Sequence, residues 1–419
     1  MTQDRLDIQP WMTAAPVRRV LAALGAGEVD VRFVGGAVRN AVMNLPVTEI
    51  DLATPDLPVR VTERLTAAHI KAVPTGITHG TVMAVVDGAT FEITTLRRDT
   101  ACDGRHAAVE FTTDWHEDAG RRDFTFNAMS LSPDGTLFDD HGGLDDANAG
   151  RVKFVGDAGD RIQEDYLRIL RLFRFFAWYG RVPLDATTLE ACRRHVGGIG
   201  RLSGERLQQE LTKLLAAPAP LTAVKLMQET GVLAEVLPQA VDTSVFARLL
   251  DLHGADDWLL RLAAILPTDT EVAEAAADHL KLSNAARDRL VLLLRDKPLP
   301  DDHADPLQLR RALYELGAKV VGERVLLAWA RAGAVASPAP WRALLEAAAS
   351  WEPKTFPVTG TDVLALGVPP GPVVGQLLAA GEHWWIGAGF TPGRAEILAH
   401  LRAVLESKNG SGGVPEPFA

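Results

Sequence analysis

The chain is poor in cysteine and has no long hydrophobic run. Cys102 and Cys192 are its only cysteines and lie far apart, so neither a disulfide framework nor a Cys-ligated zinc site is indicated. The richest apolar stretches, around residues 259–266 and 290–294, are short and flanked by charge, well below a membrane span. The N-terminus carries charged residues and no apolar core of a signal peptide. We therefore expect a cytoplasmic protein with no membrane contact.

An excess of positive charge is also missing. Lys and Arg number 43 against 54 Asp and Glu, which gives a formal net charge of −11 and argues against a general nucleic-acid coat protein. A local basic path is still compatible with this balance, because RNA contact depends on where Lys and Arg cluster. The sequence contains no His-Asp dipeptide, so a metal-dependent phosphohydrolase domain marked by that motif is not supported. The eleven histidines, among them His79 and His116, show no metal-ligand spacing and are interpreted as solvated or satisfied residues.

The 419 residues, 47% apolar and 23% charged, indicate a globular protein of two to four domains. The first 140 residues have an α/β pattern, and Asp87-Gly88 and Asp134-Gly135 are strong hairpin signals. We predict strands at 31–34 and 49–53, helices at 37–43 and 58–68, hairpins pairing 82–86 with 90–95 and 127–131 with 136–138, and a mobile loop at 97–114. Beyond residue 159 the apolar residues recur at helical spacing, with helices predicted at 161–178, 202–215 and 221–237 and no strands.

A glycine pair and two nearby carboxylates give the first chemical signal. If Glu49 and Asp51 lie on a strand, they point to the same face, roughly 7 Å apart. Two such carboxylates can share divalent cations, and Mg²⁺ takes oxygen ligands together with substrate phosphates. Gly35-Gly36 lets the backbone approach an anion at a helix start, and Arg39 can reach the same triphosphate.

Each of these features also has a purely structural interpretation. A Gly-Gly turn before a helix is often structural, and acidic residues two apart on an edge strand often form a solvated face. The segment is not a dinucleotide-binding fingerprint, because no third glycine follows at the required distance. Glu92 is a candidate third acid, since Phe91 and Ile93 would bury the opposite strand face, but it can equally be an exposed hairpin carboxylate.

Arg121-Arg122-Asp123 provides a second polar cluster. Two adjacent guanidinium groups can hold a triphosphate, and Asp123 can orient one of them or a sugar hydroxyl. The alternative is a surface Arg–Asp pair at a helix end.

The predicted helix 161–178 carries a row of charges. Asp165 and Arg168 are three residues apart, so their side chains can meet on one helical face, and Arg171 and Arg174 continue the row. A carboxylate can accept a hydrogen bond from the exocyclic amine of cytosine or adenine while a guanidinium donates to a ring acceptor. Guanine and uracil present a carbonyl there instead. The alternative is an ordinary intrahelical ion pair. The aromatic residues that follow are interpreted as core.

These motifs form an ordered set over roughly residues 30–215. The matching segments are 34–40, 49–54, 92–97, 103–106, 122–128, 140–143, 164–168 and 205–210. In this order they resemble the bacterial and eukaryotic type of CCA-adding tRNA nucleotidyltransferases and the related bacterial poly(A) polymerases. The resemblance implies a multi-domain α+β protein, with an α/β polymerase-β-like nucleotidyltransferase head at 1–150, an all-α neck at 151–220, and a helical body and tail at 221–407 for tRNA binding. Residues 408–419 are expected to be a disordered tail.

The resemblance also assigns roles to residues. It implies Mg²⁺ held by Glu49 and Asp51 in a two-metal site, with Glu92 as a third catalytic candidate. It implies base selection by Asp165 and Arg168 and a flexible loop at 97–114. The implied nucleotide-binding residues are Gly35, Gly36, Arg39, Arg122, Asp123, Asn127, Asp165, Arg168, Arg171 and Arg174.

Two positions depart from the family pattern. The first metal carboxylate of the family is commonly Asp, whereas this chain has the longer Glu49. Asn40 stands where Asp often follows the arginine, which weakens a charged role there.

The expected activity is template-independent addition of CCA to tRNA from CTP and ATP, with no obligate protein partner. Three alternatives remain at this point: a poly(A) polymerase, which we would expect to be more basic; a partial enzyme that adds only CC or only A; and a non-catalytic RNA-binding protein.

Overall fold

The computed structural model describes residues 4–102, 107–240, 242–296, 305–333 and 337–410. The chain divides into two compact units. The first contains Met1–Ala240 and Ala275–Leu282, and the second contains Val241–Glu274 and Ser283–Ala419. The predicted boundaries at 150, 220 and 407 are finer than this division and stay predictions.

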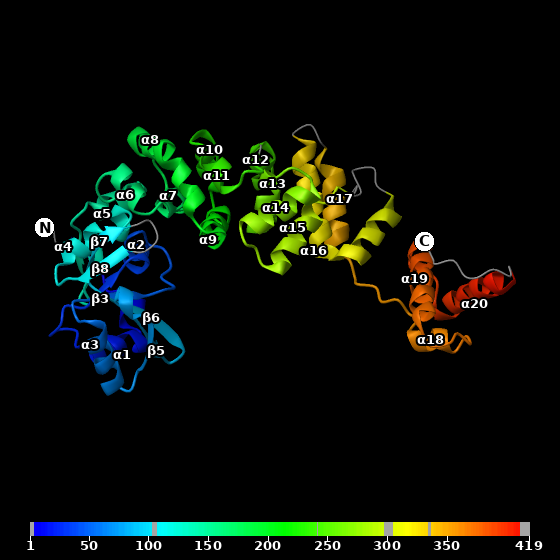
Figure 1. Ribbon diagram of the computed structural model, residues 1–419, viewed down its shortest axis with the longest axis horizontal. Coiled ribbons are helices and arrows are strands. Elements are labelled where there is room, and N and C mark those ends of the chain that lie inside the picture. The colour runs from blue at the N-terminus through cyan, green and yellow to red at the C-terminus, as the bar shows by residue number, and fades with distance from the viewer. Residues whose placement is uncertain (1–3, 103–106, 241, 297–304, 334–336, 411–419) are drawn as a thin grey trace. The chain divides into compact units, whose positions relative to one another are not determined.

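A mixed eight-stranded sheet forms the base of the first unit (Figure 1). Its order is β1-β10-β9-β2-β3-β6-β5-β4, and only β3 and β6 are parallel neighbours. The strands are β1 (Asp4–Arg5), β2 (Arg32–Val34), β3 (Asp51–Thr54), β4 (Lys71–Gly76), β5 (Thr81–Val86), β6 (Ala89–Thr95), β9 (Ser130–Leu131) and β10 (Thr136–Phe138).

Helices cover this sheet because their apolar residues lie on one face. α1 (Ala15–Leu24) buries Val17, Val20, Leu21 and Leu24, a spacing of three to four residues, and packs with α3 (Pro58–Ala67) against β5 (Figure 1). α2 (Gly36–Val42) follows β2 directly, and α4 (Trp115–Gly120) and α5 (Gly143–Ala149) complete the head.

The predicted β5–β6 hairpin is confirmed. Val82, Ala84 and Val86 alternate with more exposed residues and are buried. Asp87 and Gly88 both have positive φ, 50° and 82°, as a two-residue hairpin turn of this hand requires.

Other local predictions were wrong. The stretch 97–114 is not simply a loop, because β7 (Arg97–Cys102) pairs with β8 (Ala107–Phe111) as a separate two-stranded sheet. Residues 103–106, one of the motif segments, lie outside the described residues. Only 130–131 of the predicted strand 127–131 is extended, and Thr125–Asn127 forms a 3₁₀ turn. The predicted disordered tail begins within α20 (Arg394–Gly410), and its remainder lies outside the described residues.

The rest of the first unit is helical, as predicted. Within the described residues no strand follows β10. α7 (Leu167–Tyr179) packs against α9 (Gly204–Leu215) and α10 (Pro220–Glu229), and its buried residues include Ile169, Leu172 and Phe173. The predicted helix 221–237 is two helices, because the chain turns at Gly231 with positive φ. The remaining helices are α6 (Ala158–Glu164), α8 (Ala186–His195) and α11 (Val232–Val236).

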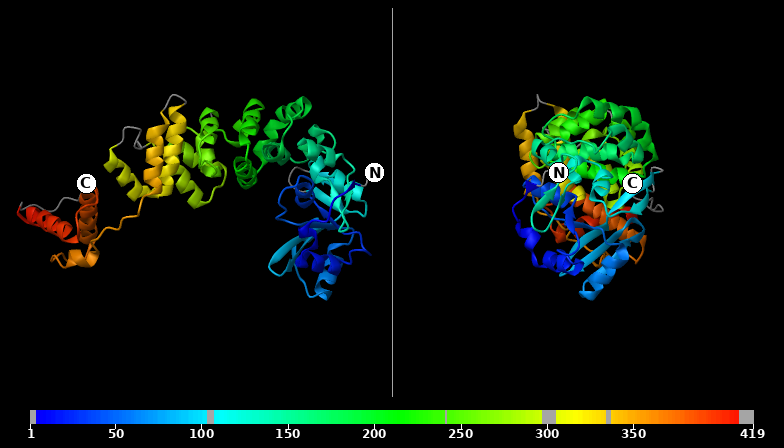
Figure 2. Two further views of the ribbon diagram at one scale, coloured as in Figure 1. Left: turned by 180° about the vertical axis from the view of Figure 1, so that it is seen from behind. Right: turned by 90° about the vertical axis from the view of Figure 1, so that its left-hand side faces the viewer.

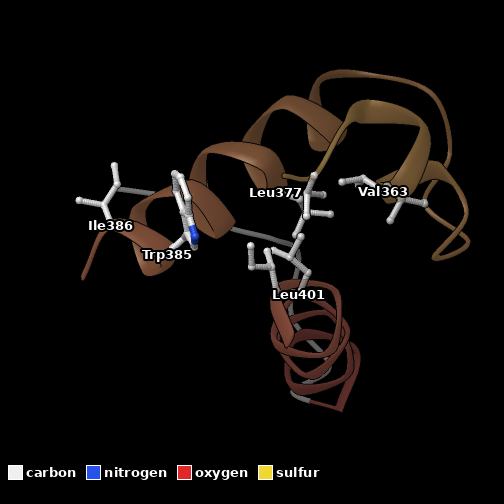
Figure 3. Packing of buried hydrophobic residues seen from close by; sticks show 8 residues of the cluster. Val363, Leu377, Trp385, Ile386 and Leu401 are labelled. Carbon is white, nitrogen blue, oxygen red and sulfur yellow. The ribbon is translucent and has the colours of Figure 1, made fainter. Parts of the chain in front are cut away.

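The second unit is all helical within its described residues and has two apolar cores. One lies between α16 (Pro306–Ala332) and α17 (Pro338–Ala349), which run side by side in Figure 1 and in the left view of Figure 2. The other joins α18 (Gly360–Leu364), α19 (Pro372–Gly387) and α20, where Leu377 faces Leu401 and Val363 (Figure 3). Gly381 permits this close approach, since a Cβ there would lie 3.2 Å from Leu401. The other helices are α12 (Ser244–Leu250), α13 (Trp258–Ile265) and α15 (Asn284–Leu294), and α14 (Thr270–His279) spans both units.

Candidate active site

A cleft of about 910 Å³ opens in the first unit between the sheet and α7. Nine basic and five acidic side chains line it, so this surface is locally cationic although the whole chain is acidic. All the predicted site residues except Glu92 lie on its wall, and their roles stay predictions. The lining residues are Gly35, Gly36, Arg39, Glu49, Asp51, His79, Arg97, Val109, Arg121, Arg122, Asp123, Asn127, Glu164, Asp165, Leu167, Arg168, Arg171, Arg174, Phe175, Trp178, Tyr179, Arg206 and Lys213.

Three carboxylates gather at one end of the cleft. Asp51 begins β3, and the parallel pairing places it opposite Glu92 on β6. Burial, followed by the negative charges of Glu92 and Glu49, raises the pKa of Asp51 to about 6, against a smaller opposing effect of Arg122. Glu92 is exposed on the strand face opposite buried Phe91, as predicted, but it is not on the cleft wall. Glu49 precedes β3, so the expected same-strand relation of Glu49 and Asp51 is wrong, although both line the cleft.

Gly35 closes the same end of the cleft. It ends β2, caps α2, and has φ 66° and ψ −131°, a conformation that residues with a side chain rarely adopt. A Cβ at Gly35 would lie 3.6 Å from the Asp51 carboxylate and 3.8 Å from Arg122 Nη1. The glycine therefore brings backbone, carboxylate and guanidinium within contact distance of one another.

Arg39 is buried in the cleft wall and held on three sides. Its Nη1 donates to Asn127 Oδ1 at 2.8 Å, and its Nη2 donates to Asn40 Oδ1 at 2.8 Å. The guanidinium also lies 4.5 Å from the centre of the Tyr179 ring. Asn40 in turn donates to the carbonyl of Pro46. The departure to Asn40 thus leaves a neutral group that orients Arg39 without adding charge.

Asp118 orients the two adjacent arginines. This carboxylate is buried; Arg121 Nη2 donates to its Oδ1 at 2.7 Å and Arg122 Nη2 donates to its Oδ2 at 2.9 Å. Burial would raise the pKa of Asp118, but the charges of Arg122 and Arg121 outweigh it and hold that pKa below its usual value. Burial and the charges of Arg122 and Arg97 lower the pKa of Arg121 to about 10, although Asp118 counteracts them. One carboxylate therefore serves two guanidinium groups.

Asp123 links α7 to the sheet. Its Oδ2 accepts from Arg171, at 2.7 Å from Nε, and its Oδ1 accepts from Asn127 Nδ2 at 3.0 Å. Burial would raise the pKa of Asp123, but Arg171 and these hydrogen bonds hold it below its usual value. On the next turn of α7, Arg174 donates to the buried Glu210 of α9 at 3.1 Å. Arg171 is thus held mainly by Asp123 and Arg174 by Glu210, and Arg171 Nη1 also lies 3.9 Å from Glu210 Oε1.

The predicted continuous helix 161–178 is wrong in a way that affects the site. The chain breaks at Asp165, whose extended backbone ends α6 before α7 begins. Asp165 Oδ1 accepts from the backbone of Leu167 at 3.0 Å, and its Oδ2 accepts from Arg206 at 2.8 Å. The i, i+3 helical contact expected between Asp165 and Arg168 is therefore not formed.

Arg168 instead pairs with Glu164 and donates to the backbone carbonyl of Arg161 at 2.9 Å. Asp165 and Arg168 nevertheless both line the cleft. Their ion pairs are with other residues, Arg206 and Glu164, and not with each other. Asp165 is thus held in place by Arg206, and Arg168 is held in place by Glu164.

Two families of sequences match the chain. Residues 31–153 match the poly A polymerase head domain, and residues 182–243 match the probable RNA and SrmB-binding site of polymerase A. CCA tRNA nucleotidyltransferase 1, mitochondrial, of Mus musculus is 33% identical over 385 residues, which cover 89% of this chain and 86% of that protein. The chain belongs to the CCA-adding tRNA nucleotidyltransferase family.

Other members of this family agree in length and fold. The CCA-adding enzyme of Limosilactobacillus fermentum is 31% identical over 369 residues, covering 87% of this chain and 90% of that enzyme. The crystal structure of the Bacillus stearothermophilus CCA-adding enzyme in complex with CTP superposes with a TM-score of 0.76 at 28% identity, over 95% of this chain and all of that one. The predicted family and fold class, a nucleotidyltransferase head followed by helices, are confirmed.

Among the described residues, no helix is both long enough and apolar enough to cross a membrane. The cytoplasmic location stays a prediction, since the mouse and human relatives are named as mitochondrial proteins.

The sequence did not identify several residues that shape the cleft. Asp118 was not singled out, although its spacing of three and four residues from Arg121 and Arg122 is the signal of helical ion pairs. Arg206 and Glu210 were recognised as a motif without a role. His79 is exposed, as predicted, but it also lines the cleft. Of the aromatics interpreted as core, Phe173 and Phe175 are buried, whereas Trp178 is 43% exposed on the cleft wall.

The described residues contain no group of three or more His, Cys, Asp and Glu side chains arranged to hold a metal ion. A magnesium site here would therefore need ligands beyond the protein. The available protein donors are carboxylate oxygens of Glu49 and Asp51 on the cleft wall, and Mg²⁺ commonly binds through one or two carboxylates plus substrate phosphates. The donor set fits a nucleotide-bound magnesium ion.

Proposed function

We propose that the chain adds C, C and A to the 3′ end of tRNA from CTP and ATP, with release of pyrophosphate. The observation that carries the proposal is the cleft itself, in which crowded carboxylates, an excess of guanidinium groups, and Asp165 with Arg168 share one wall. These are the groups that a reaction between an RNA hydroxyl and a nucleoside triphosphate needs. The named activity of the aligned relatives supports the same reaction.

The guanidinium groups hold the triphosphate in this proposal. Arg39 and Arg122 are oriented by Asn127 and Asp118, so their hydrogen-bond donors are fixed before the nucleotide arrives. Because Arg121 and Arg122 share one carboxylate, a bound triphosphate would supply the negative charge that this pair lacks. The same donors stabilise the charge that develops on the leaving pyrophosphate.

Glu49 and Asp51 would hold the magnesium ions. Burial and the negative charges of Glu92 and Glu49 raise the pKa of Asp51, and a cation between the carboxylates would relieve the repulsion, so this donor set suits a cation. When bound, Mg²⁺ would favour ionisation of the attacking hydroxyl and neutralise charge on the leaving group. Glu49 has one methylene more than aspartate and still reaches the cleft wall.

The reaction is then an in-line displacement. The 3′-hydroxyl oxygen of the RNA attacks the α-phosphorus, a new phosphodiester bond forms, and the bond to the β-phosphate bridging oxygen breaks. The hydroxyl proton passes to a carboxylate of the acidic end. Glu92 is a candidate that pairs in register with Asp51, and it would have to reach the hydroxyl from outside the cleft wall.

Asp165 and Arg168 select the base. Asp165 accepts from the exocyclic amine of cytosine or adenine, and Arg168 donates to the adjacent ring acceptor. The bond from Arg206 fixes the Asp165 carboxylate, and Glu164 fixes the Arg168 guanidinium. Uracil and guanine are rejected because their carbonyl would face the carboxylate.

The decisive experiment offers tRNA that lacks its 3′ CCA with Mg²⁺ and each of CTP, ATP, GTP and UTP, singly and mixed. We expect CC with CTP alone, CCA with CTP and ATP together, and no use of GTP or UTP. Long A tails would make the chain a poly(A) polymerase, and addition that stops at CC, or that needs a tRNA ending in CC, would make it a partial enzyme. No incorporation under any mixture would leave the non-catalytic RNA-binding alternative.

The metal assignment has a separate readout. At pH 7 with CTP present, Mg²⁺ should raise the melting temperature of the wild-type protein, and Asp51→Asn should reduce that increment because one ligand is lost. Glu49→Asp, a matched change that keeps the carboxylate, should preserve it. An equal increment in wild type and Asp51→Asn would contradict a role of Asp51 in holding the ion.

A further inference from the structure

Trp178 is an exposed aromatic side chain on the cleft wall. It lies in the last turn of α7, a helix that buries Phe173, Phe175 and Ala177, yet 43% of Trp178 is exposed. Of the large apolar side chains that are exposed in the described part of the chain, Trp178 is the one that lines the cleft. An apolar surface is thus left open to the space where a ligand would bind.

The indole ring is held in a fixed orientation. Its Nε1–H donates to the backbone carbonyl of Lys213 at 2.7 Å. Lys213 lies in the last turn of α9, where carbonyl groups have no partner within the helix. The bond therefore satisfies the end of α9 and at the same time fixes the ring before any ligand arrives.

Aromatic and basic groups adjoin each other here. The Tyr179 ring lies 6.4 Å from Trp178, lines the same cleft, and has the Arg39 guanidinium 4.5 Å from its centre. The Lys213 side chain is exposed and also lines the cleft. Aromatic faces combined with a basic surface are the usual means of binding single-stranded nucleic acid, since every base can stack and every phosphate is attracted.

Trp178 is too far from the base-selecting residues to contact the same base. Arg168 and Trp178 are ten residues apart on α7, which corresponds to roughly 15 Å along the helix axis. Arg171 and Trp178 are seven residues apart, close to two full turns, so both point to one side of the helix. A base read by Arg168 thus leaves Trp178 free for a second base.

We propose that Trp178 is a stacking platform for one unpaired base of the RNA strand whose 3′ end is extended, with the Lys213 ammonium available to a phosphate of that strand. The inference rests on the proposed function, because extension of an RNA end is what brings a second nucleotide into the cleft. It assigns the far end of α7 to the RNA and the near end to the incoming nucleotide.

The first test measures equilibrium binding of tRNA ending in CC, without any nucleoside triphosphate. Trp178→Ala should raise the dissociation constant about 5- to 150-fold, the range expected from one lost stacking interaction. Trp178→Phe keeps an aromatic face and should stay within about threefold of wild type. Leu57→Ala removes an equally exposed apolar side chain at the start of α3, outside the cleft, and should change nothing. Melting temperatures establish that each variant is folded.

The second test locates the base. Three tRNA substrates each lack one of the last three bases but keep the sugar and phosphate. Wild type should lose affinity for one of them, and Trp178→Ala should lose no further affinity for that same substrate. If removing each base lowers the affinity of Trp178→Ala as much as it lowers that of wild type, at all three positions, the stacking proposal is overturned.

Two other outcomes would also overturn it. If Trp178→Phe binds tRNA as weakly as Trp178→Ala does, the hydrogen bond to Lys213 matters rather than the ring face. If Trp178→Ala raises KM for CTP or ATP while RNA binding is unchanged, the ring contacts the incoming nucleotide. Binding is measured without turnover, so it can be interpreted even if the wild-type protein adds no nucleotide. That failure would contradict the proposed function and not the stacking proposal.

Discussion

Both units bury charged side chains, but they balance them differently. At the cleft of the first unit, the buried Asp118 serves the two lining residues Arg121 and Arg122, and the lining as a whole is basic. In the second unit, Arg289 of α15 is bound by two carboxylates, 2.9 Å from Asp257 Oδ1 and 3.0 Å from Glu323 Oε2, and so joins α13 to α16.

The pKa values of Arg121 and Arg289 express this difference at these two sites. Burial and neighbouring cations lower the pKa of Arg121 to about 10. Burial acts on Arg289 in the same direction, but Glu323 and Asp257 outweigh it and raise the pKa of Arg289 above its usual value. An under-compensated cluster is suited to receive an anionic ligand, whereas a fully compensated one holds helices together. Mutations in the two regions should therefore separate activity from stability.

The largest effect is expected at the acidic end of the cleft. Asp51→Asn removes a proposed metal ligand and should lower kcat about a thousandfold or more, equivalent to roughly 4 kcal/mol of transition-state stabilisation. Stability should not fall, because a carboxylate repelled by Glu92 and Glu49 is replaced by a neutral group. The measurements are single-turnover addition of C to tRNA and thermal unfolding. A variant that loses its fold along with its activity would place Asp51 among the structural residues instead.

Asp118→Asn should have the next largest effect. The variant leaves Arg121 and Arg122 without a counter-ion and free to reorient, so KM for CTP and ATP should rise about 100-fold, or roughly 2.8 kcal/mol. Binding of tRNA in the absence of nucleotide is the internal control and should change much less. An unchanged KM would mean that the two guanidinium groups do not contact the triphosphate.

Arg289→Ala should lower stability and leave activity almost unchanged, the reverse of the two variants at the cleft. It leaves the buried Glu323 without its closest partner, and because Arg289 and Asp257 are partly exposed we expect a loss of only about 1–2 kcal/mol. The folded variant should keep kcat within about twofold of wild type. Denaturant unfolding gives the first quantity and nucleotide addition the second. The double variant Arg289→Ala with Glu323→Gln should recover part of the loss; a large fall in kcat would break the distinction between the two regions.

The sequence was informative where one segment carries the signal. The Asp87-Gly88 hairpin, the glycine pair before α2 and the helical spacing beyond residue 159 follow from local preferences, and the structure has them. The ordered motifs also identified the family, and the predicted site residues other than Glu92 meet on one cleft wall although they lie up to 139 positions apart, from Gly35 to Arg174.

What the sequence could not give are partners distant in the chain. The break at Asp165 is stabilised by Arg206, 41 residues later, and Arg174 finds Glu210 on another helix. Helical periodicity alone predicts a continuous helix and an Asp165–Arg168 pair, because it contains no information about α9. The hairpin of β7 and β8 was missed for the related reason that polar edge strands lack apolar alternation.

The smallest predicted effect distinguishes the two regions by the sign of their pH dependence. The pKa of Asp51 is raised to about 6 by burial and by Glu92 and Glu49. Between about pH 4 and pH 6 the folded protein keeps a proton that the unfolded chain has released, so this group makes the fold less stable as the pH rises. Asp51→Asn removes that dependence. The melting temperature of wild type minus that of the variant should therefore fall by about 1–3 °C from pH 4 to pH 6.

Asp257 should show the opposite slope. Burial would raise its pKa, but the bonds from Arg289 and from the start of α13 hold that pKa below its usual value. Its stabilising contribution is thus present above its ordinary pKa and is lost as the pH falls through the lowered one. Asparagine at this position still caps α13, so Asp257→Asn isolates the charge. The melting temperature of wild type minus that of Asp257→Asn should be positive at pH 6 and should shrink toward pH 3. Thermal unfolding of the three proteins in EDTA from pH 3 to pH 7 tests both slopes together, and two slopes of the same sign would show that the acidic end of the cleft is compensated in the same way as the helical network.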